Sequence, residues 1–587
     1  MNRRIYLLPI FLIVVLGCAS YASSLKGGFV LDDQDIIVRN AYIKSGLTLS
    51  NILKEDLTPA GKKKYGFYRP VAQLSYRIDY TLWKLNTLGY HLTNMILHIL
   101  AALALYWLAQ AIFQEKLLSL LAAMLFVSHP AHVETVAYIS DRADILAALF
   151  MLLSLIFYVK QLGDKRPGRD IFLSVSCFVV ALLSKENSII LPALLVVYHF
   201  AFWKRVRLSA FLPIAILPVV YLTARILFFK SAAIDANSIT TIWQRMPAFF
   251  AAIPGYIRLL VLPLGLHMDY GNPLFKFTHP RVMAGIILLT AFVVYALRYI
   301  LKPKRGGALI FFSVSWFFVS LLPVSNIYYL FSYMAEHFLY LPSIGFCLIL
   351  SEGIKRLYKT DRYRITAMIL AVSVVAGYSY LTFGQNDYWR DPAKMYARTL
   401  EYNPKSVNAM INLSNFYKNN GDTKGAIDLL KKAIALEPFN GIAFNNIAMI
   451  YEEMGQHDTA ESLYKKAIGL DLHYVASYNN LGVLYENAGR IEDATALYKR
   501  AIDVNPNYAA PYNNLGAIYG NKGRLQEARI LYEKAIKVDP DYAEAYDNLS
   551  RYYFQKREYK QAIEYCDKAV RRGVVNYELI KALEPYR

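Results

Sequence analysis

The first two thirds of the chain alternate long apolar runs with short polar connectors, whereas the last third is polar and repetitive. Apolar runs of about 20 residues have the length of membrane-spanning helices. Eleven runs, some of them short, can be read at about 5–24, 91–113, 117–136, 144–162, 171–184, 188–203, 208–229, 281–301, 307–322, 335–352 and 365–384. The pattern predicts an all-α protein in which residues 1–384 form a polytopic membrane domain of about eleven spans.

The first run has a second interpretation. It follows Met1-Asn2-Arg3-Arg4, as the apolar core of a signal peptide would, and Val15-Leu16-Gly17-Cys18 resembles a bacterial lipoprotein cleavage box. Many spans follow it, and a retained first helix is the commoner arrangement in a multi-spanning protein. We therefore expect this helix to be kept.

Basic residues in the connectors predict the orientation of the spans, because such residues mark cytoplasmic loops. They gather at Arg3-Arg4, Lys165–Arg169, Lys204–Arg207, Lys302–Arg305 and Lys355–Arg364. The connectors Lys204–Arg207 and Lys302–Arg305 lie on the same side only if an even number of crossings separates them, and the runs 208–229 and 281–301 already make two. The proline-containing stretch 247–264 is therefore expected not to cross. The N-terminus is then cytoplasmic and the C-terminal part extracytoplasmic, in the periplasm beside a bacterial inner membrane or in the lumen of the endoplasmic reticulum.

Composition supports this division of the chain. The protein is 56% hydrophobic and carries a net charge of +20, but residues 385–587 hold 27 basic and 26 acidic residues, against 37 and 18 in residues 1–384. These values exclude a disordered or an ordinary soluble protein. The basic excess fits membrane orientation and not nucleic acid, because no basic stripe interleaved with aromatic residues occurs. The four dispersed cysteines give no disulfide framework and no metal-ligand spacing.

From about Lys405 the chain repeats every 34 residues. The period is marked by Asn412, Asn446, Asn480, Asn514 and Asn548, and by Gly421, Gly455, Gly489 and Gly523 with Arg557 at the fifth position. This is the tetratricopeptide signature. It predicts five repeats over 405–574, a linker at 385–404 and a capping tail at 575–587.

Stacked repeats of this kind form a solenoid whose concave groove usually binds extended polypeptide. The five asparagines resemble a ladder that holds a peptide backbone by amide contacts. An equally acceptable interpretation is that they form hydrogen bonds between helices. No residue constellation in the repeats is typical of catalysis.

Acidic residues of the membrane half gather on the predicted outer side, where a charge avoids the cost of lying within the bilayer. They are Asp32, Asp33, Asp35, Glu134, Asp141, Asp144, Glu186, Asp269 and Glu336. Basic groups and histidines accompany them, namely His129, His132, Arg142, Lys185 and His337. The sequence therefore predicts a polar cavity of mixed charge at the outer membrane face.

Each cluster keeps two interpretations. Asp32 and Asp33 either cap a helix or provide a general base or cation ligand. His129, His132 and Glu134 lack the spacing of a known zinc motif, and Pro130 between them is typical of a helix start, so we predict no metal site. A divalent cation remains compatible with the acids.

The basic residues have the same ambiguity. Arg142 either forms an ion pair and cap within 140–144 or holds a phosphate, for which its guanidinium is suited. Lys185 either reaches towards the interface in a turn or supplies positive charge to a leaving phosphate.

Taken together, several motifs resemble those of the transmembrane and tetratricopeptide-repeat-containing O-mannosyltransferases, which have the GT-C fold. They are Gly28–Asp33, Tyr68-Arg69-Pro70, Tyr90–Asn94, His129–Glu134, Arg142–Asp144, Ser184–Glu186 and Glu336–Ser343. The resemblance covers the whole chain in the family order. The small number of repeats indicates a bacterial relative.

The resemblance implies transfer of a hexose, with mannose favoured, from a polyprenyl phosphate to Ser or Thr hydroxyls of a polypeptide held by the repeats. It implies Asp33 or Asp32 as the base, and Arg142 and Lys185 as groups facing the donor phosphate. His337 stands where the family has Arg, so it would bind phosphate only when protonated. The remaining cavity positions are His129, His132, Glu134, Asp144, Glu186, Glu336 and Tyr340.

Two rival functions remain open. One is a membrane-anchored scaffold that assembles partners through the repeats without catalysis. The other is the same transfer chemistry with a lipid or glycan as the acceptor. No Gly-rich phosphate cradle is present, which favours a lipid-linked sugar over a nucleotide sugar.

Overall fold

The computed structural model describes residues 4–38, 40–44, 68–162, 167–228, 241–303, 307–327, 330 and 332–587. The regular elements of these residues are all helical. The chain forms two compact units, which meet in sequence at Pro404 and Lys405, and the second also includes the short described stretches between Asp35 and Lys44. Of the predicted cytoplasmic positions, Arg3, Lys165, Arg166, Lys304 and Arg305 lie outside the described residues.

The first unit is a bundle of α-helices. The helices are α1 (Arg4–Tyr21), α4 (Pro70–Trp83), α5 (Thr87–Phe113), α6 (Lys116–Ser128), α7 (Val133–Ala137), α8 (Arg142–Gln161), α9 (Pro167–Ser184), α10 (Leu191–Phe202), α11 (Leu208–Phe228), α12 (Ile242–Val261), α13 (Pro280–Leu301), α14 (Ala308–Ser320), α15 (Ser343–Lys359), α16 (Arg364–Arg390) and α17 (Pro392–Tyr402). The last two helices contain residues 385–402, which the sequence predicts as part of a linker.

Six described helical segments are long and apolar enough to cross a membrane: Leu7–Lys26, Thr87–Phe113, Ile139–Gln161, Leu208–Leu227, Pro280–Leu301 and Asp361–Arg390. A seventh is obtained if Lys116–Ser128 and Pro130–Ala137, which bend by 54°, form one span. The structure therefore supports about six or seven such helices by length and composition. The predicted run 335–352 shows one reason for the smaller number, because its helix begins only at Ser343.

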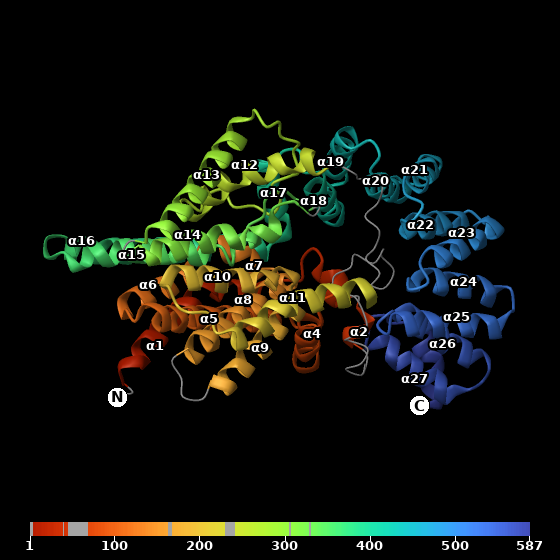
Figure 1. Cartoon of the computed structure of the whole chain (residues 1–587). Helices are drawn as coiled ribbons and strands as arrows, with labels where there is room; N and C mark the ends of the chain where they lie inside the picture. Colours follow the sequence, from red (N-terminus) through yellow and green to blue (C-terminus); the bar gives the residue numbers. More distant parts are fainter. Residues whose placement is uncertain are drawn as a thin grey trace. The chain divides into compact units, whose positions relative to one another are not determined.

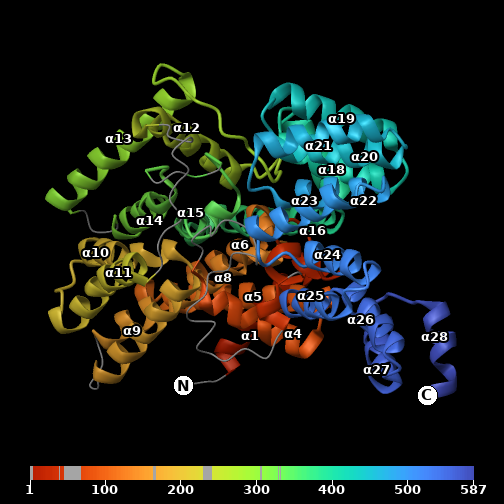
Figure 2. The same ribbon diagram turned by 90° about the vertical axis from the view of Figure 1, so that its right-hand side faces the viewer.

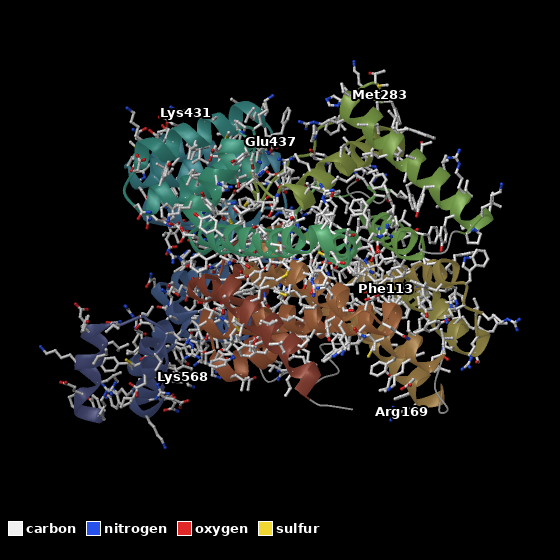
Figure 3. All side chains as sticks on the ribbon, turned by 90° about the vertical axis from the view of Figure 1, so that its left-hand side faces the viewer. Phe113, Arg169, Met283, Lys431, Glu437 and Lys568 are labelled. Atoms are coloured by element: carbon white, nitrogen blue, oxygen red, sulfur yellow. The ribbon has the colours of Figure 1, made fainter. Side chains whose placement is uncertain are left out.

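Helices α5 and α8 form the centre of the first unit. They pack against each other, and α9 packs along α8 (Figure 1). The most apolar stretch of Ile139–Gln161 is 61% buried and that of Thr87–Phe113 is 56% buried, whereas that of Pro280–Leu301 is only 11% buried. Met283 accordingly lies on the outer side of α13 (Figure 3). We expect the exposed apolar side chains of α13 to face lipid.

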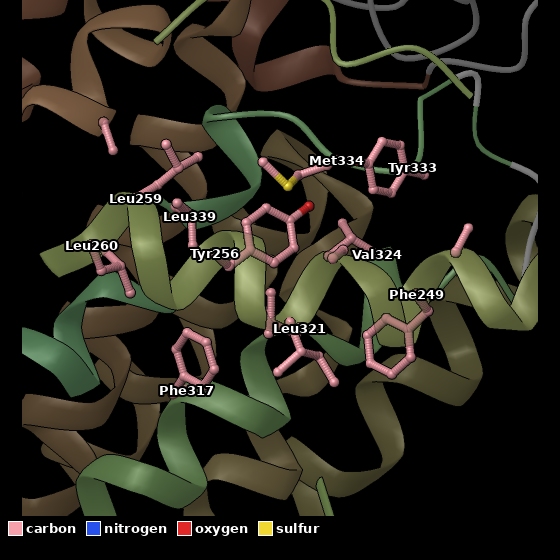
Figure 4. Close-up of a cluster of buried hydrophobic side chains, with 14 of the residues drawn as sticks. Phe249, Tyr256, Leu259, Leu260, Phe317, Leu321, Val324, Tyr333, Met334 and Leu339 are labelled. Atoms are coloured by element: carbon pink, nitrogen blue, oxygen red, sulfur yellow. The ribbon is translucent and has the colours of Figure 1, made fainter. Parts of the chain in front are cut away.

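The stretch 247–264 forms most of α12, which is not among the six membrane-length segments of the described chain. One side of α12 is buried in an apolar cluster (Figure 4). Tyr256 and Leu259 of α12 pack there with Phe317 of α14 and with Leu321. Tyr333, Met334 and Leu339 belong to the same cluster, so this burial holds α12 beside the segment 333–339.

The second unit contains the five predicted helix pairs, which follow one another along the chain (Figure 2). They are α18 (Val407–Asn419) with α19 (Thr423–Leu436), α20 (Gly441–Glu453) with α21 (His457–Leu470), α22 (Val475–Asn487) with α23 (Ile491–Val504), α24 (Ala509–Asn521) with α25 (Leu525–Val538), and α26 (Ala543–Gln555) with α27 (Tyr559–Val570). Helix α28 (Tyr577–Leu583) follows in the predicted capping tail.

The repeat signature has a direct physical cause. Gly421, Gly455, Gly489 and Gly523 each have φ between 75° and 83° in the turn between paired helices, a left-handed conformation that glycine adopts without steric cost. Arg557 adopts the same turn with φ 61°. Small residues are also needed where the helices cross, since a Cβ on Gly482 would lie only 2.6 Å from the Tyr498 ring.

Candidate active site

Asp33 anchors a strained turn that follows the first helix. Its Oδ2 accepts from Val30 N at 3.0 Å, and its Oδ1 accepts from Ser140 N at 2.8 Å and from the Ser140 hydroxyl. Leu31, within the turn, has φ 50°, an uncommon conformation for a residue with a branched side chain. Burial raises the pKa of Asp33 to about 7, although the hydrogen bonds from Ser140 and Val30 lower it.

Asp32, the neighbouring acid, is exposed, whereas Asp33 is completely buried. The Asp32 backbone N–H donates to the Tyr138 hydroxyl at 3.1 Å. The Tyr138 ring stacks on Trp389 near the end of α16, with ring centroids 5.7 Å apart. The turn therefore presents one carboxylate to solvent and uses the next one to fix its own position.

Arg142, at the start of α8, is fully buried and has protein partners on all three guanidinium nitrogens. Nη2 pairs with Asp79 Oδ2 at 2.6 Å, and Nε donates to Asn94 Oδ1 at 2.6 Å. Nη1 donates to Ser75 Oγ at 3.2 Å, while the guanidinium lies over the Tyr76 ring, 4.8 Å from its centroid. The ion pair anticipated for Arg142 exists, but with Asp79 of α4 and not within residues 140–144. Its binding of a donor phosphate stays a prediction.

Two further ion pairs lie at the ends of α8 and α9. The Lys185 ammonium contacts Asp144 Oδ2, and 7% of the Lys185 side chain is exposed. Arg69 binds Glu186 through two parallel contacts, Nη2 to Oε1 at 2.8 Å and Nε to Oε2 at 3.3 Å. The Arg69 and Glu186 side chains are 15% and 29% exposed, so this second pair is accessible to solvent.

Glu134, Asp141 and His337 converge from three separate elements. His337 Nδ1 lies 2.8 Å from Glu134 Oε1 and 3.6 Å from Asp141 Oδ2, and His337 N donates to Glu134 Oε2 at 2.9 Å. Burial lowers the pKa of His337, but the charges of Asp141 and Glu134 outweigh it and raise the pKa to about 9. His337 is therefore a cation near neutral pH in this surrounding.

Glu336 lies in a different environment from its neighbour. Its Oε1 accepts from His267 N at 2.6 Å and from the Tyr270 hydroxyl at 2.9 Å, and its side chain is fully buried. Burial, followed by the charge of Glu134, raises the pKa of Glu336 well above its usual range.

His129, His132 and Tyr340 belong to a buried aromatic cluster. His129 Nε2 lies 3.0 Å from Leu260 O, and its Nδ1 accepts from Ala131 N, so the residue caps the short helix that Pro130 begins. His132 contacts Phe126 O and Ser343 Oγ, each at 2.9 Å. The Tyr340 hydroxyl lies 2.8 Å from a ring nitrogen of His98. The helix start predicted at Pro130 is therefore present, and the bend there separates α6 from α7, which carries Glu134.

The asparagine ladder of the repeats is hydrogen-bonded from one repeat to the next. The Nδ2 groups of Asn446, Asn480, Asn514 and Asn548 donate to the side-chain oxygens of Asn415, Asn445, Asn479 and Asn513 at 2.8 to 3.2 Å. Asn412 donates to the carbonyl of Asn408 in its own helix. The inter-helix interpretation is therefore realised. Each amide keeps a second N–H, so contact with a peptide stays a prediction.

Three charged residues in these contacts were not selected from the sequence as site residues: Arg69, Asp79 and Asp141. Each lies in an apolar half of the chain, where a charge requires a partner. That rule could have identified them as members of pairs. The rule could not have identified their partners. Arg142 and Asp79 are 63 positions apart in the sequence, and Arg69 and Glu186 are 117 positions apart.

The described helices and repeats define a class, a multi-pass membrane protein followed by a tetratricopeptide solenoid. Tetratricopeptide repeat models match residues 407–440, 439–507, 475–541 and 507–572. Among solved structures, PilF of Pseudomonas aeruginosa is 23% identical, covers 31% of this chain and 85% of its own, and has a TM-score of 0.28.

The chain is a distant relative of the TMTC protein O-mannosyl-transferases. One such protein from Caenorhabditis elegans is 27% identical over 451 residues, which cover 73% of this chain and 63% of the relative. TMTC3 of Mus musculus is 24% identical over 472 residues, which cover 73% of this chain and 51% of the relative. The chain thus spans only about half to three fifths of the length of these curated relatives.

Proposed function

We propose that this protein is a membrane glycosyltransferase that moves a hexose, with mannose favoured, from a polyprenyl phosphate to Ser or Thr hydroxyls of extracytoplasmic polypeptides. The observation that carries the proposal is the set of charges held by the first unit. These charges lie where apolar helices end, and they are Asp32, the pair Asp144–Lys185 and the pair Arg69–Glu186. At such a position a lipid-borne phosphate and a water-soluble acceptor can meet. The distant relationship to protein O-mannosyl-transferases supports the same chemistry.

Asp32 is the better candidate for the general base, because a base must reach the acceptor hydroxyl. Its side chain is exposed, whereas both oxygens of Asp33 are occupied by Val30 and Ser140. In the proposed step the acceptor oxygen bonds to C1 of the sugar and the bond from C1 to the phosphate oxygen breaks. The hydroxyl proton passes to Asp32, and the polyprenyl phosphate leaves as an anion. Asp33 positions the turn.

Lys185 and Arg69 are the cations we assign to the leaving phosphate. Their side chains are 7% and 15% exposed, and each is held by an acid, Asp144 or Glu186. Preorganised cations stabilise the negative charge that develops on the leaving group. Arg142 is completely buried and fully paired, so we assign it to positioning the start of α8.

The repeats supply the acceptor in this proposal. An uncharged ladder of asparagine amides suits the backbone of an extended polypeptide, and capture of the acceptor raises its concentration at the site. The GT-C arrangement of about eleven spans, the periplasmic location of the repeats and a bacterial host belong to the same proposal.

The decisive experiment is Asp32→Asn in the full-length protein. Transfer of labelled mannose from polyprenyl-phosphate mannose to a Ser/Thr peptide should fall by about 10²- to 10⁴-fold, the usual contribution of a general base. Asp361→Asn changes an exposed acid far from the site in sequence and should leave transfer unaltered. Unchanged transfer in Asp32→Asn and in Asp33→Asn, with normal expression, would remove the catalytic proposal and leave the anchored scaffold.

A further inference from the structure

The cluster of Glu134, Asp141 and His337 has the composition and spacing of a metal site. Glu134 comes from α7, while Asp141 and His337 come from short 3-10 turns (residues 139–141 and 337–339). One ligand atom from each residue lies within 4.8 Å of the other two. The side chains are 7%, 14% and 21% exposed, respectively. The site is thus mostly buried, with part of each side chain accessible to solvent.

Hydrogen bonding leaves acceptor oxygens in and beside this cluster without partners among the described residues. His337 Nδ1 lies 2.8 Å from Glu134 Oε1, within hydrogen-bond reach, but 3.6 Å from Asp141 Oδ2. Asp141 Oδ2 is buried and has no hydrogen-bond partner among the described residues. A buried polar oxygen without a hydrogen-bond partner is unfavourable. Oε2 of the adjacent and fully buried Glu336 is likewise unpartnered within the described chain.

We propose that Glu134, Asp141 and His337 bind one divalent cation, with Mn²⁺ as the best match. Two carboxylate oxygens and one imidazole nitrogen are ligands that Mn²⁺ accepts together. Ligand atoms about 2.1 Å from an ion at right angles are about 3 Å apart, close to the 2.8 and 3.6 Å separations present here.

Three protein ligands leave coordination positions open, as in catalytic metal sites. An oxygen of the donor phosphate is the group we assign to an open position. This assignment of a role rests on the proposed function, whereas binding of the ion does not. A Lewis acid at that position would stabilise the charge of the leaving phosphate.

The test is Mn²⁺ binding by full-length protein that has been stripped with a chelator in detergent, followed by electron paramagnetic resonance and calorimetry without any sugar donor. The wild type should bind one Mn²⁺ per chain. Asp141→Asn and Glu134→Gln should each weaken binding by about tenfold or more, since loss of even an outer partner has that effect. His337→Arg should abolish binding, because the guanidinium is a permanent cation and cannot act as a ligand.

Asp361→Asn serves as the matched control and should bind Mn²⁺ as the wild type does. Size-exclusion profiles and melting temperatures show which variants remain folded. No saturable site in the wild type up to about 1 mM Mn²⁺, the weak end of protein metal sites, would overturn the inference. Wild-type affinity in folded Asp141→Asn and Glu134→Gln would overturn it as well.

The same samples separate this inference from the proposed function. Sugar transfer by chelator-stripped protein that binds no Mn²⁺ would overturn the metal site and leave the transferase intact. Mn²⁺ binding that depends on Asp141, in a protein without transfer activity, would support the metal site and count against the transferase.

Discussion

The two units hold their polar groups in opposite ways. In the first unit, polar contacts join residues far apart in sequence, and most are buried: Asp33 with Ser140 and Glu134 with His337 are separated by 107 and 203 positions. Within the repeats of the second unit, contacts are local or recur between neighbouring repeats, as in Lys568 with Glu564 and Asn514 with Asn479. A solenoid distributes its stability over equivalent neighbours. The stability of the first unit depends more on individual contacts between distant residues, so we expect function and sensitivity to mutation to be greatest at those contacts.

The largest expected effect of a substitution is at Asp79. Asp79→Ala leaves the fully buried guanidinium of Arg142 without its counter-charge, which typically destabilises a protein by about 3–5 kcal/mol. We expect poor expression and a clearly lower melting temperature in detergent. The double variant Asp79→Leu with Arg142→Met removes both charges and should recover much of the loss. Equal stability of Asp79→Ala and wild type would contradict the contrast drawn between the units.

The next effect concerns pH. The pKa of Asp33 is raised from 3.8 to about 7 by burial, so the carboxylate that holds Val30 and Ser140 is protonated below that pH. Transfer should rise with pH up to about 7 and then level off, changing about tenfold per unit on the acidic side. Asp33→Asn should remove this limb of the pH profile, whereas Asp32→Asn should lower the rate at every pH.

Linkage gives stability the opposite pH dependence. A carboxyl group with a raised pKa in the folded state favours folding when it is protonated, and this contribution is lost as pH rises from about 4 through 7. Melting temperatures of wild type and Asp33→Asn across this range measure it. A parallel pH dependence in the two proteins would show that Asp33 does not titrate there.

A smaller effect is expected in the solenoid at Arg557. It occupies the left-handed turn that glycine occupies in the other four repeats. Arg557→Gly should therefore stabilise the last helix pair by up to about 1 kcal/mol, less the extra entropy that glycine gives the unfolded chain. Hydrogen exchange of α26 and α27 in the full chain measures the change. Gly489→Arg is the reverse substitution and should increase exchange in α22 and α23.

The smallest effect is expected for an exposed ion pair of the solenoid. Lys568 Nζ lies 2.6 Å from Glu564 Oε1, and the two side chains are 38% and 59% exposed. Ion pairs this exposed add little to stability. Glu564→Ala should leave the melting temperature unchanged within error. A loss as large as that of Asp79→Ala would mean that exposed pairs matter as much as buried ones here.

The sequence predicted the solenoid almost completely and the site only by composition. A 34-residue period indicates helix pairs, and the glycine in the turn of the first four pairs has a local steric reason for its position. In the membrane half, the apolar runs and the acidic residues could likewise be identified from local sequence. The count of about eleven spans stays a prediction, because six or seven described helical segments have the length and composition to cross a membrane and the helix in the run 335–352 begins only at Ser343.

Partners within the site were beyond sequence reasoning. Glu134 was selected together with His129 and His132 because the three are adjacent, yet it contacts His337, 203 positions away. Arg142 was selected for a phosphate and pairs with Asp79. The residues adjacent to a site residue in the sequence do not predict which residues of other helices it contacts in the folded protein.

The sequence by itself determined the helical class, the membrane and repeat regions and the supply of acids, because these depend on spacing and hydrophobicity along a local stretch. Only the tertiary structure decided which charges meet, which are buried and which of two adjacent carboxylates is exposed. The physical reason is that the free energy of a charge depends on the groups packed around it, and these come from distant parts of the chain.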